Sequence, residues 1–426
     1  MTPRVNPPEV DVDSGLLAYS TVGGRHRARL RTTYGDFQVE ELLEIKELRR
    51  TKENGLVPVY RVTKTGVDTP HVAREISDII KSEVNFAGLK DSNAVVVQHM
   101  SARSTRALSP AELKGKRFEA KLMGFSKPIT RSMLIGNGFK IFVETAEDLG
   151  SDIESGFDAC TGRRVANFFG YQRFGLRSRV NRRAGKAIVE KDFESAVGLI
   201  LTEPREGEDE EVKEARRLFK EERYADALPF LSSGQDIERG MASHLSAKPG
   251  DHLGALRRIP IPIRRLLVNS YQGYLFNLTV SRALEEGLDF SAAMSGDNWA
   301  SVTESGLLVG RVHGAREDVP SNPPELAVPL VQIVGYAYRN YGSRFDRLLA
   351  EVLEEEQVSP ARFYIKEADE MSNEGGFRHA PLLCRDLSFR RDPRGFLLEF
   401  SLGKGEYATV VLREILKPEQ PQLEGF

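Results

Sequence analysis

One carboxylate, Asp91, lies between two apolar stretches in the segment FAGLKDSNAVVVQHMSA, residues 86–102. Lys90 precedes it, and an ammonium group beside a carboxylate could keep it ionised or bind a phosphate. An ionised carboxylate at the tip of a loop can act as a nucleophile or as a general base. Aspartate and glycine are also common turn formers. Taken alone, the segment is better explained as a turn between two strands than as a catalytic site.

The strongest anomaly in composition is residues 160–191, CTGRRVANFFGYQRFGLRSRVNRRAGKAIVEK. Nine Lys and Arg side chains face a single acid, Glu190, and four aromatic residues interleave with them: Phe168, Phe169, Tyr171 and Phe174. Nucleic-acid binding needs cations for phosphates and rings for unstacked bases. A solvated basic helix whose rings belong to the core would have the same composition, so both interpretations stay open. A second, smaller basic cluster comprises Arg25, Arg27, Arg29 and Arg31.

Several common mechanisms lack their motifs in this sequence. Gly-x-x-x-x-Gly-Lys-Ser/Thr, Gly-x-Gly-x-x-Gly, Gly-x-Ser-x-Gly and His-Glu-x-x-His do not occur. The seven histidines are scattered, and the two cysteines, Cys160 and Cys384, form no Cys-x-x-Cys. The sequence therefore predicts neither a metal site nor a bound cofactor.

The bulk numbers describe a soluble globular protein, with 426 residues, 40% hydrophobic and 29% charged. That length favours two domains, one of them possible as an insertion in the other. A net charge of −2 argues against a generally basic nucleic-acid coat but permits a local basic groove. The few cysteines, the absence of a signal peptide and the absence of a membrane-length apolar run predict a cytoplasmic protein without membrane attachment.

The hydrophobic periodicity predicts an α+β chain. Residues 1–24 are expected to form a loose arm, and residues 27–43 to form strand, turn and strand. Further strands are predicted at 56–62, 117–125, 139–146 and 396–402, and on both sides of Asp91. Helices are predicted at 71–81, 260–287, 344–356 and 406–416, and the charge-rich stretch 203–227 should be a solvated loop followed by a surface helix. Residues 296–335 should be rich in strands and loops, with a break at SNPPE.

Seven segments, in order, resemble those of the TruD-type tRNA pseudouridine synthases. The three signature segments are FAGLKDSNAVVVQHMSA, ANFFGYQRFG (166–175) and VNSYQGYLFN (268–277). The supporting segments are LRTTYGDFQVEE (30–41), LIGNGFKIFVE (134–144), EGGFRHAPL (374–382) and SLGKGEYATVVLREI (401–415). The chain resembles archaeal members in length, and the likeness spans nearly all of it.

This resemblance implies an intramolecular isomerase that converts a uridine in tRNA to pseudouridine with an essential aspartate, without cofactor or metal and with no obligatory protein partner evident. It implies a catalytic domain with a mixed, largely antiparallel sheet and flanking helices. An α+β domain specific to the family is inserted in it. Together with the shift in composition near residue 193, this gives residues 1–192 and 371–426 to the catalytic domain and 193–370 to the insertion. The family favours position 13 of tRNA, with position 35 or other RNAs open for archaeal-type members.

The resemblance also assigns roles to single residues. Asp91 would be the catalytic group, as a nucleophile or as a base on the sugar. Phe169 would stack on the target base, and Asn167 would help to place Asp91. Gln172 and Arg173 match the same segment, and Arg31 matches a basic position that could pair with Asp91 and lower its pKa. Segment VNSYQGYLFN is expected to be buried helix core rather than part of the site.

The chain departs from the family after GLKD, where a basic pair and a Thr are common. Here Ser92, Asn93 and Val96 follow, so fewer phosphate contacts are expected from this loop and more from residues 163–186. Two rival functions remain: a catalytically idle RNA-binding protein of the same fold, and a hydrolase that cleaves a glycosidic bond. A hydrolase needs a second carboxylate to activate water, and the sequence offers no convincing partner for Asp91.

Overall fold

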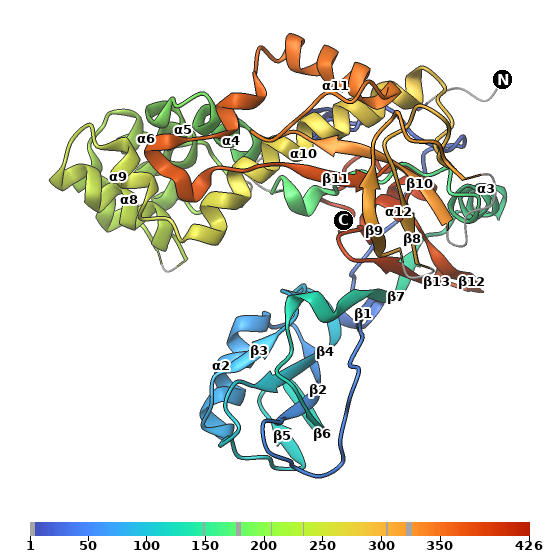
Figure 1. Ribbon diagram of the computed structural model, residues 1–426. Coiled ribbons are helices and arrows are strands. Elements are labelled where there is room, and N and C mark those ends of the chain that lie inside the picture. Colours follow the sequence, from blue (N-terminus) through green and yellow to red (C-terminus); the bar gives the residue numbers. More distant parts are fainter. Residues whose placement is uncertain are drawn as a thin grey trace.

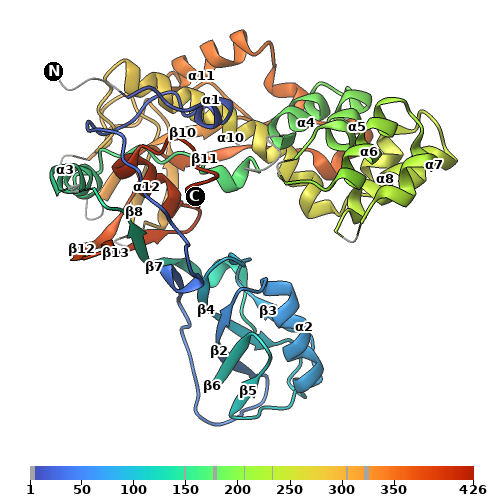
Figure 2. The same cartoon turned by 180° about the vertical axis from the view of Figure 1, so that it is seen from behind.

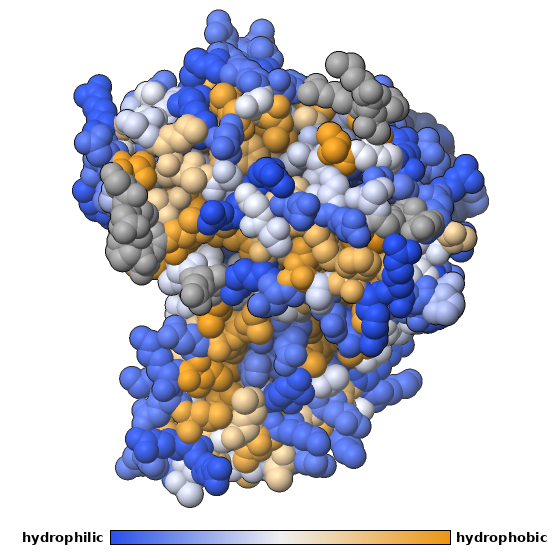
Figure 3. All heavy atoms as spheres, turned by 90° about the vertical axis from the view of Figure 1, so that its right-hand side faces the viewer, coloured by the Kyte–Doolittle hydropathy of each residue, from blue (hydrophilic) through white to orange (hydrophobic). Residues whose placement is uncertain are grey.

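The computed structural model of the chain describes residues 5–147, 150–175, 180–205, 207–232, 234–303, 306–320 and 326–426. A small lobe, residues 44–133, hangs below a larger body made by the rest of the chain (Figures 1 and 2). In a space-filling view from the side, a notch marks the junction of the two (Figure 3). None of the helices in the described ranges has both the length and the apolar character needed to cross a membrane.

One nine-stranded sheet joins the small lobe to the body (Figure 1). Its order is β12-β13-β7-β1-β4-β2-β6-β5, with β3 paired to β4. The strands are β1 (Phe37–Leu43), β2 (Val57–Thr65), β3 (Val84–Phe86), β4 (Val95–Ala102), β5 (Glu112–Lys114), β6 (Phe118–Ser126), β7 (Leu134–Glu144), β12 (Arg385–Asp392) and β13 (Gly395–Gly403). Strands β1 and β4 run parallel, and the other described pairs are antiparallel. The predicted mixed, largely antiparallel sheet is thereby confirmed.

The strand pattern follows from alternation of side chains along β1. Phe37, Val39 and Glu41 point to the buried side, while Gln38 and Glu40 are exposed. The register with β7 sets Glu41 opposite Asn137. A charged side chain therefore lies on the buried face of the strand, which requires a partner there.

Helix α2 (Thr69–Ile80) covers the small lobe's part of the sheet (Figure 2). Val72, Ile76 and Ile80 lie on its inner face in one hydrophobic cluster with strands β2 and β4. Asp68 caps the helix by accepting from the backbone N–H of His71 at 2.7 Å. The helix is the one predicted from the spacing of its aliphatic residues.

The other helices belong to the body (Figure 1). They are α1 (Glu9–Asp13), α3 (Gly150–Thr161), α4 (Val180–Val189), α5 (Phe193–Thr202), α6 (Glu210–Lys220), α7 (Tyr224–Ala227), α8 (Asp236–Ala247), α9 (His252–Leu256), α10 (Ile261–Glu285), α11 (Arg344–Glu355) and α12 (Ala408–Leu416). Helices α4 to α9 gather at one end, and α10 runs from them to the sheet. Leu267, Tyr271 and Leu275 of α10 are buried, as predicted for this segment.

A second, antiparallel sheet has the order β11-β10-β8-β9. Its strands are β8 (Trp299–Val302), β9 (Leu308–His313), β10 (Leu326–Ile333) and β11 (Gly376–His379). The predicted break at SNPPE, 321–325, lies outside the described residues. Helix α4, before residue 193, packs on α10, and β11, after residue 370, pairs with β10. The division at 193 and 370 stays a proposal.

The first 24 residues were expected to be loose, and from residue 5 onward this is wrong. The carboxylate of Asp11 is fully buried and accepts from Arg413 Nε of α12 at 2.7 Å and from the Tyr171 hydroxyl at 2.5 Å. The backbone N–H of Ser20 donates to Glu414 at 2.8 Å. The strand expected before Arg31 is also absent: that segment makes one isolated bridge, between Arg29 and Glu144. Buried charge pairing, which periodicity does not report, anchors the arm.

Replacing Asp11 by Ala should destabilise the fold. The Arg413 guanidinium, 1% exposed, would lose one of its two carboxylate partners. Breaking a buried pair from one side costs about 3–5 kcal/mol. Urea denaturation of Asp11→Ala should show that loss, while Glu53→Ala, at an exposed position, should stay within about 0.5 kcal/mol of the wild type. Equal stability of the two variants would mean that the buried network does not hold the arm.

Candidate active site

Asp91 lies in the loop between β3 and β4, the strand–loop–strand arrangement predicted from the sequence. Its side chain is 43% exposed, and Oδ2 accepts from Nη2 of Arg31 at 2.9 Å. The guanidinium of Arg31 lies 4.0 Å from the centre of the Phe37 ring on β1. The structure thus brings Arg31 and Asp91 together across 60 residues of sequence, with the carboxylate open to solvent and the cation covered.

The C-terminal segment fixes the conformation of Arg31. Arg31 has a φ of 58°, a left-handed conformation that is uncommon outside glycine. The N–H of Leu30 donates to the Glu424 carbonyl at 2.8 Å, and Nη1 of Arg31 donates to the Gly425 carbonyl at 3.3 Å. Gly425 has a φ of 89°, and a Cβ there would meet the Leu30 carbonyl oxygen at 2.3 Å. Only glycine permits this close approach behind Arg31.

Lys64 on β2 bonds to the backbone of the loop that bears Asp91, a role that was not predicted from the sequence. Its Nζ, on a residue 1% exposed, donates to the Asp91 carbonyl at 2.8 Å and to the Val67 carbonyl at 2.7 Å. Burial lowers the pKa of Lys64 to about 8, and the nearby carboxylates of Asp91 and Asp68 oppose that shift. The available signal was a lysine in phase with the buried Val62 on the same strand.

Lys90 holds the loop rather than the carboxylate beside it. Its Nζ lies 3.2 Å from Oε1 of the fully buried Glu41 and donates to Asn137 Oδ1 at 2.6 Å. Burial acts to raise the pKa of Glu41, but hydrogen bonds from His99 and the charge of Lys90 outweigh it and lower that pKa. The Lys90 side chain is 6% exposed. Of the roles expected for it, contact with a phosphate does not fit this burial.

Phe169 of the NFFG segment is fixed by an asparagine of α10. Asn277 accepts from the Phe169 N–H at 2.8 Å and donates to the Phe169 carbonyl at 3.0 Å. The ring is 5% exposed, with the guanidinium groups of Arg173 and Arg378 at 4.7 Å and 4.5 Å from its centre. Stacking on a base stays a prediction for Phe169, and it requires that these two guanidinium groups move away from the ring. VNSYQGYLFN is buried helix as expected, yet its Asn277 also positions the motif.

Asn167 makes its side-chain contacts with β11. Its Nδ2 lies 3.0 Å from Nδ1 of His379, and its Oδ1 accepts from Arg378 Nη2 at 2.5 Å. The structure gives it no contact with Asp91 among the described residues. Arg378, from EGGFRHAPL, was missed by the sequence analysis, although it also bonds the Asn167 carbonyl at 2.9 Å. Burial lowers its pKa to about 10.

Gln172 and Arg173 follow in the short turn η3 (Tyr171–Arg173). Gln172 is exposed and accepts from the Thr409 hydroxyl at 3.1 Å. The Arg173 carbonyl accepts from Ser270 at 2.6 Å, and burial lowers the pKa of its guanidinium. Both residues therefore lie beside Phe169, at the junction of α10 and α12.

The later part of the basic segment is mostly neutralised. Arg183 pairs with Glu203 at 2.8 Å, Lys186 with Glu356 at 2.9 Å and Lys191 with Glu367 at 3.1 Å. Arg177 and Arg179 lie outside the described residues. From residue 180 onward the interpretation as a basic helix with a buried face therefore holds, and fewer of these cations are free for phosphates than expected.

The turn after β13 links the Asp91 loop to the Phe169 segment. Asn137, the partner of Lys90, pairs with Leu402 of β13 in the sheet. Three residues later, the Gly405 carbonyl accepts from Arg378 Nη1 at 2.8 Å. Tyr407 then meets the Phe169 ring edge to face at 6.3 Å. The Gly-Lys-Gly turn thus borders both groups of candidate site residues.

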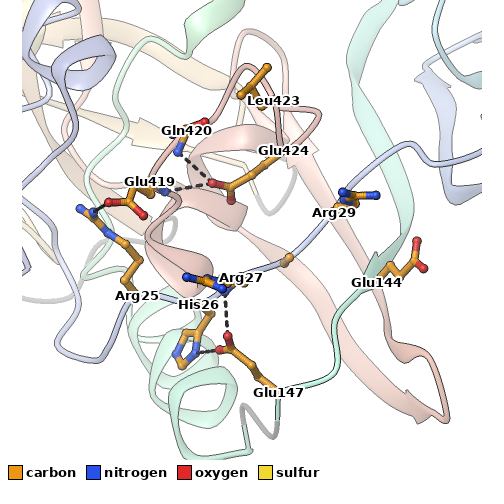
Figure 4. A pocket seen from close by; sticks show the side chains of 11 residues that line it. Arg25, His26, Arg27, Arg29, Glu144, Glu147, Glu419, Gln420, Leu423 and Glu424 are labelled. Carbon is orange, nitrogen blue, oxygen red and sulfur yellow. Dashed lines mark hydrogen bonds and ion pairs between the residues drawn. The ribbon is translucent and has the colours of Figure 1, made fainter.

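A pocket of the body lies next to this site but does not contain Asp91. It holds about 610 Å³ between the segment Arg25–Arg29, the end of β7 and the C-terminal residues (Figure 4). One of its arginines, Arg25, pairs with Glu419 at 3.3 Å. In the described ranges no three His, Cys, Asp or Glu side chains are grouped so as to hold a metal ion.

Comparison with known proteins defines the class. The family model described as tRNA pseudouridine synthase D (TruD) matches residues 13–415. A Methanosarcina mazei protein named "Probable tRNA pseudouridine synthase D" is 31% identical over 98% of this chain and 99% of its own, and one of that name from Pyrococcus furiosus is 32% identical over 95% and 98%. The crystal structure of TruD from Methanosarcina mazei superposes with a TM-score of 0.77 at 29% identity, covering 98% of this chain and 100% of its own.

The fold and these matches define a pseudouridine synthase, an isomerase that turns uridine in RNA into pseudouridine. The chain belongs to the tRNA pseudouridine synthase D (TruD) family.

Replacing Lys64 by Met should lower the single-turnover rate about 10- to 100-fold, because a misplaced reacting group costs that much, and leave the Kd for tRNA within about twofold. Since the folded pKa of Lys64 is about 8, the wild-type rate should fall as pH rises through that value, and Lys64→Met should lack this decline.

The contribution of Lys64 to the free energy of unfolding should change with pH in the opposite direction to the rate. The unfolded lysine binds more protons between about pH 8 and its ordinary pKa, so its contribution to stability rises with pH there. Lys121→Met, at an exposed position on β6, is the control.

Replacing Gly425 by Ala should lower the rate constant about tenfold or more, because the new methyl group would displace Leu30 and with it Arg31. Gly55→Ala is a matched control: its φ is 83°, and a Cβ there meets nothing within 4 Å. Single-turnover rates at saturating tRNA test the pair of variants. If both retain the wild-type rate, the C-terminal segment does not position Arg31.

Proposed function

We propose that the chain converts uridine 13 of tRNA to pseudouridine, with Asp91 as the catalytic carboxylate and without cofactor, metal or obligatory protein partner, in the cytoplasm. The observation that carries this proposal is the ion pair between Asp91 and Arg31. The loop that bears Asp91 is fixed by Lys64, which bonds to the Asp91 carbonyl, and by Lys90, which pairs with the buried Glu41. The carboxylate stays partly open to solvent while its supports are buried. A side chain that reacts with a large substrate needs to be accessible and to be held on a rigid support.

The reaction breaks the N-glycosidic bond, turns the uracil and joins its carbon to the same ribose. Asp91 would either attack the ribose or remove a proton from it, and both routes need the carboxylate ionised. Arg31 donates a hydrogen bond to this carboxylate at 2.9 Å. Because no atom enters or leaves overall, a single carboxylate can serve both the breaking and the forming of the bond to ribose.

The target uridine must leave the RNA stack to reach Asp91, at a cost of a few kcal/mol. Base–aromatic stacking contributes about 1–3 kcal/mol, so Phe169 could repay much of this cost. For Phe169 to stack, Arg173 and Arg378 must uncover its ring. We propose that RNA binding drives this change, which for Arg378 requires that its bonds to Asn167 and Gly405 break.

The hydrolase alternative would need a second carboxylate free to activate water. Glu41 supports the same loop, but it is fully buried and bonded to Lys90 and to the His99 N–H at 2.9 Å. It cannot approach a water above Asp91. The base should therefore be retained in the RNA.

Asp91→Asn should lower pseudouridine formation at least about 1,000-fold, because the amide can neither attack nor accept a proton. Unmodified tRNA is incubated with each variant, and pseudouridine is mapped by position. Asp386→Asn, an exposed aspartate with a left-handed φ of 54°, is the isosteric control and should keep full activity.

Full activity of Asp91→Asn would exclude Asp91 as the catalytic group. Pseudouridine at another position, with tRNA carrying cytidine 13 still modified, would contradict the proposed target while leaving the role of Asp91 intact. Release of free uracil would show hydrolysis.

A further inference from the structure

Two cations, Arg131 and Lys404, meet beside the catalytic loop although 273 residues separate them. Nζ of Lys404, in the Gly-Lys-Gly turn after β13, donates to the Arg131 carbonyl at 2.9 Å. Both residues are exposed. Within the part of the chain that the structure describes, the ammonium group of Lys404 bonds to a backbone oxygen rather than to a carboxylate, so this contact does not require a charged head.

Neighbours of Arg131 contact the segment that leads into the loop of Asp91. Arg131 opens the turn η2 (Arg131–Met133), and Ile129 and Leu134 on its two sides pack in one cluster with Ala87. Leu134 Cδ2 lies 3.8 Å from the position of a Cβ on Gly88. The cations therefore flank the entry to the loop, three residues before Asp91.

The pair has no counter-charge within the part of the chain that the structure describes. No ion pair joins Arg131 or Lys404 to a carboxylate, in contrast to Arg183, Lys186 and Lys191. Partial burial and the charge of Arg131 both lower the pKa of Lys404. Two like charges held this close favour a bound anion, since an anion would relieve their repulsion.

We propose that Arg131 and Lys404 form a binding site for one backbone phosphate of the RNA next to the target uridine. The inference rests on the proposed function of Asp91. It also accounts for the uncharged Ser92 and Asn93: the cations that this loop lacks are supplied by η2 and by the turn after β13. A phosphate held here fixes the register of the strand at Asp91 without reading its sequence.

The test measures tRNA affinity between 50 and 300 mM KCl for the wild type, Arg131→Gln, Lys404→Gln and the double variant. Each phosphate contact contributes a slope of about 0.7–0.9 in log K against log salt. The double variant should therefore lower the slope by about 0.7–0.9, the share of one phosphate. Each single variant should weaken binding about 3- to 10-fold near physiological salt.

Arg131→Gln is the sharper variant, because the carbonyl that Lys404 contacts is retained and only the charge is lost. Lys220→Gln, at an exposed position at the end of α6 in the helical end of the body (Figure 1), is the matched control and should leave both the slope and the affinity unchanged. Equal slopes for the wild type and the double variant, in enzyme that still forms pseudouridine, would overturn the phosphate site and leave the role of Asp91 standing.

A second arm identifies the phosphate. RNA substrates carry a single neutral methylphosphonate at successive linkages around the target. At one linkage the substitution should weaken binding to the wild type but not to the double variant, since both cations are lost there. If every linkage affects both proteins equally, the cations do not bind an RNA phosphate, and a free anion such as inorganic phosphate would be their ligand.

Discussion

The structure of this site depends on holding one solvent-open carboxylate still. An ion pair with an exposed partner contributes only about 0–1 kcal/mol, so the Asp91–Arg31 contact cannot set its own geometry. The rigidity comes from what lies behind it. Arg31 is held against the Phe37 ring and the Gly425 carbonyl, and Lys64 holds the backbone of Asp91 itself. The cost of burying these cations is met by hydrogen bonds to fixed carbonyls rather than by further carboxylates.

The need to hold the loop of Asp91 still also explains the buried acid Glu41, which pairs with Lys90 of that loop. Glu41 occupies an inward position on β1, where an apolar residue would pack at no electrostatic cost. It is offset by Lys90 and by the backbone of His99. This arrangement turns the lysine beside Asp91 away from the carboxylate. Arg31 is consequently the cation that donates a hydrogen bond to the Asp91 carboxylate among the described residues.

Much of the fold could be predicted from the sequence, because its elements are periodic over 9 to 25 residues: α2, α10, α12 and β13 lie where alternation or helical spacing places them. Asp91 and the NFFG segment were identified through ordered motifs. Lys64, Asn277 and Arg378 were not, because each acts on a backbone group distant in sequence, and no local pattern reports such a partner. The prediction of a loose N-terminal arm was wrong for the same reason, because the cation that pairs with the buried Asp11 is the distant Arg413.

Charge distribution is the last constraint that the fold imposes. A protein of net charge −2 binds a polyanion only if its cations are left unpaired in the right place. At the helical end of the body, Arg183, Lys186 and Lys191 pair with glutamates. This part of the most basic segment is therefore expected to attract RNA only weakly. Near the loop of Asp91, the buried Lys64 bonds to carbonyls and the exposed Lys404 has no acid beside it among the described residues. If these charges draw an RNA backbone to the loop, as we propose, its sugars are brought to the Asp91 carboxylate.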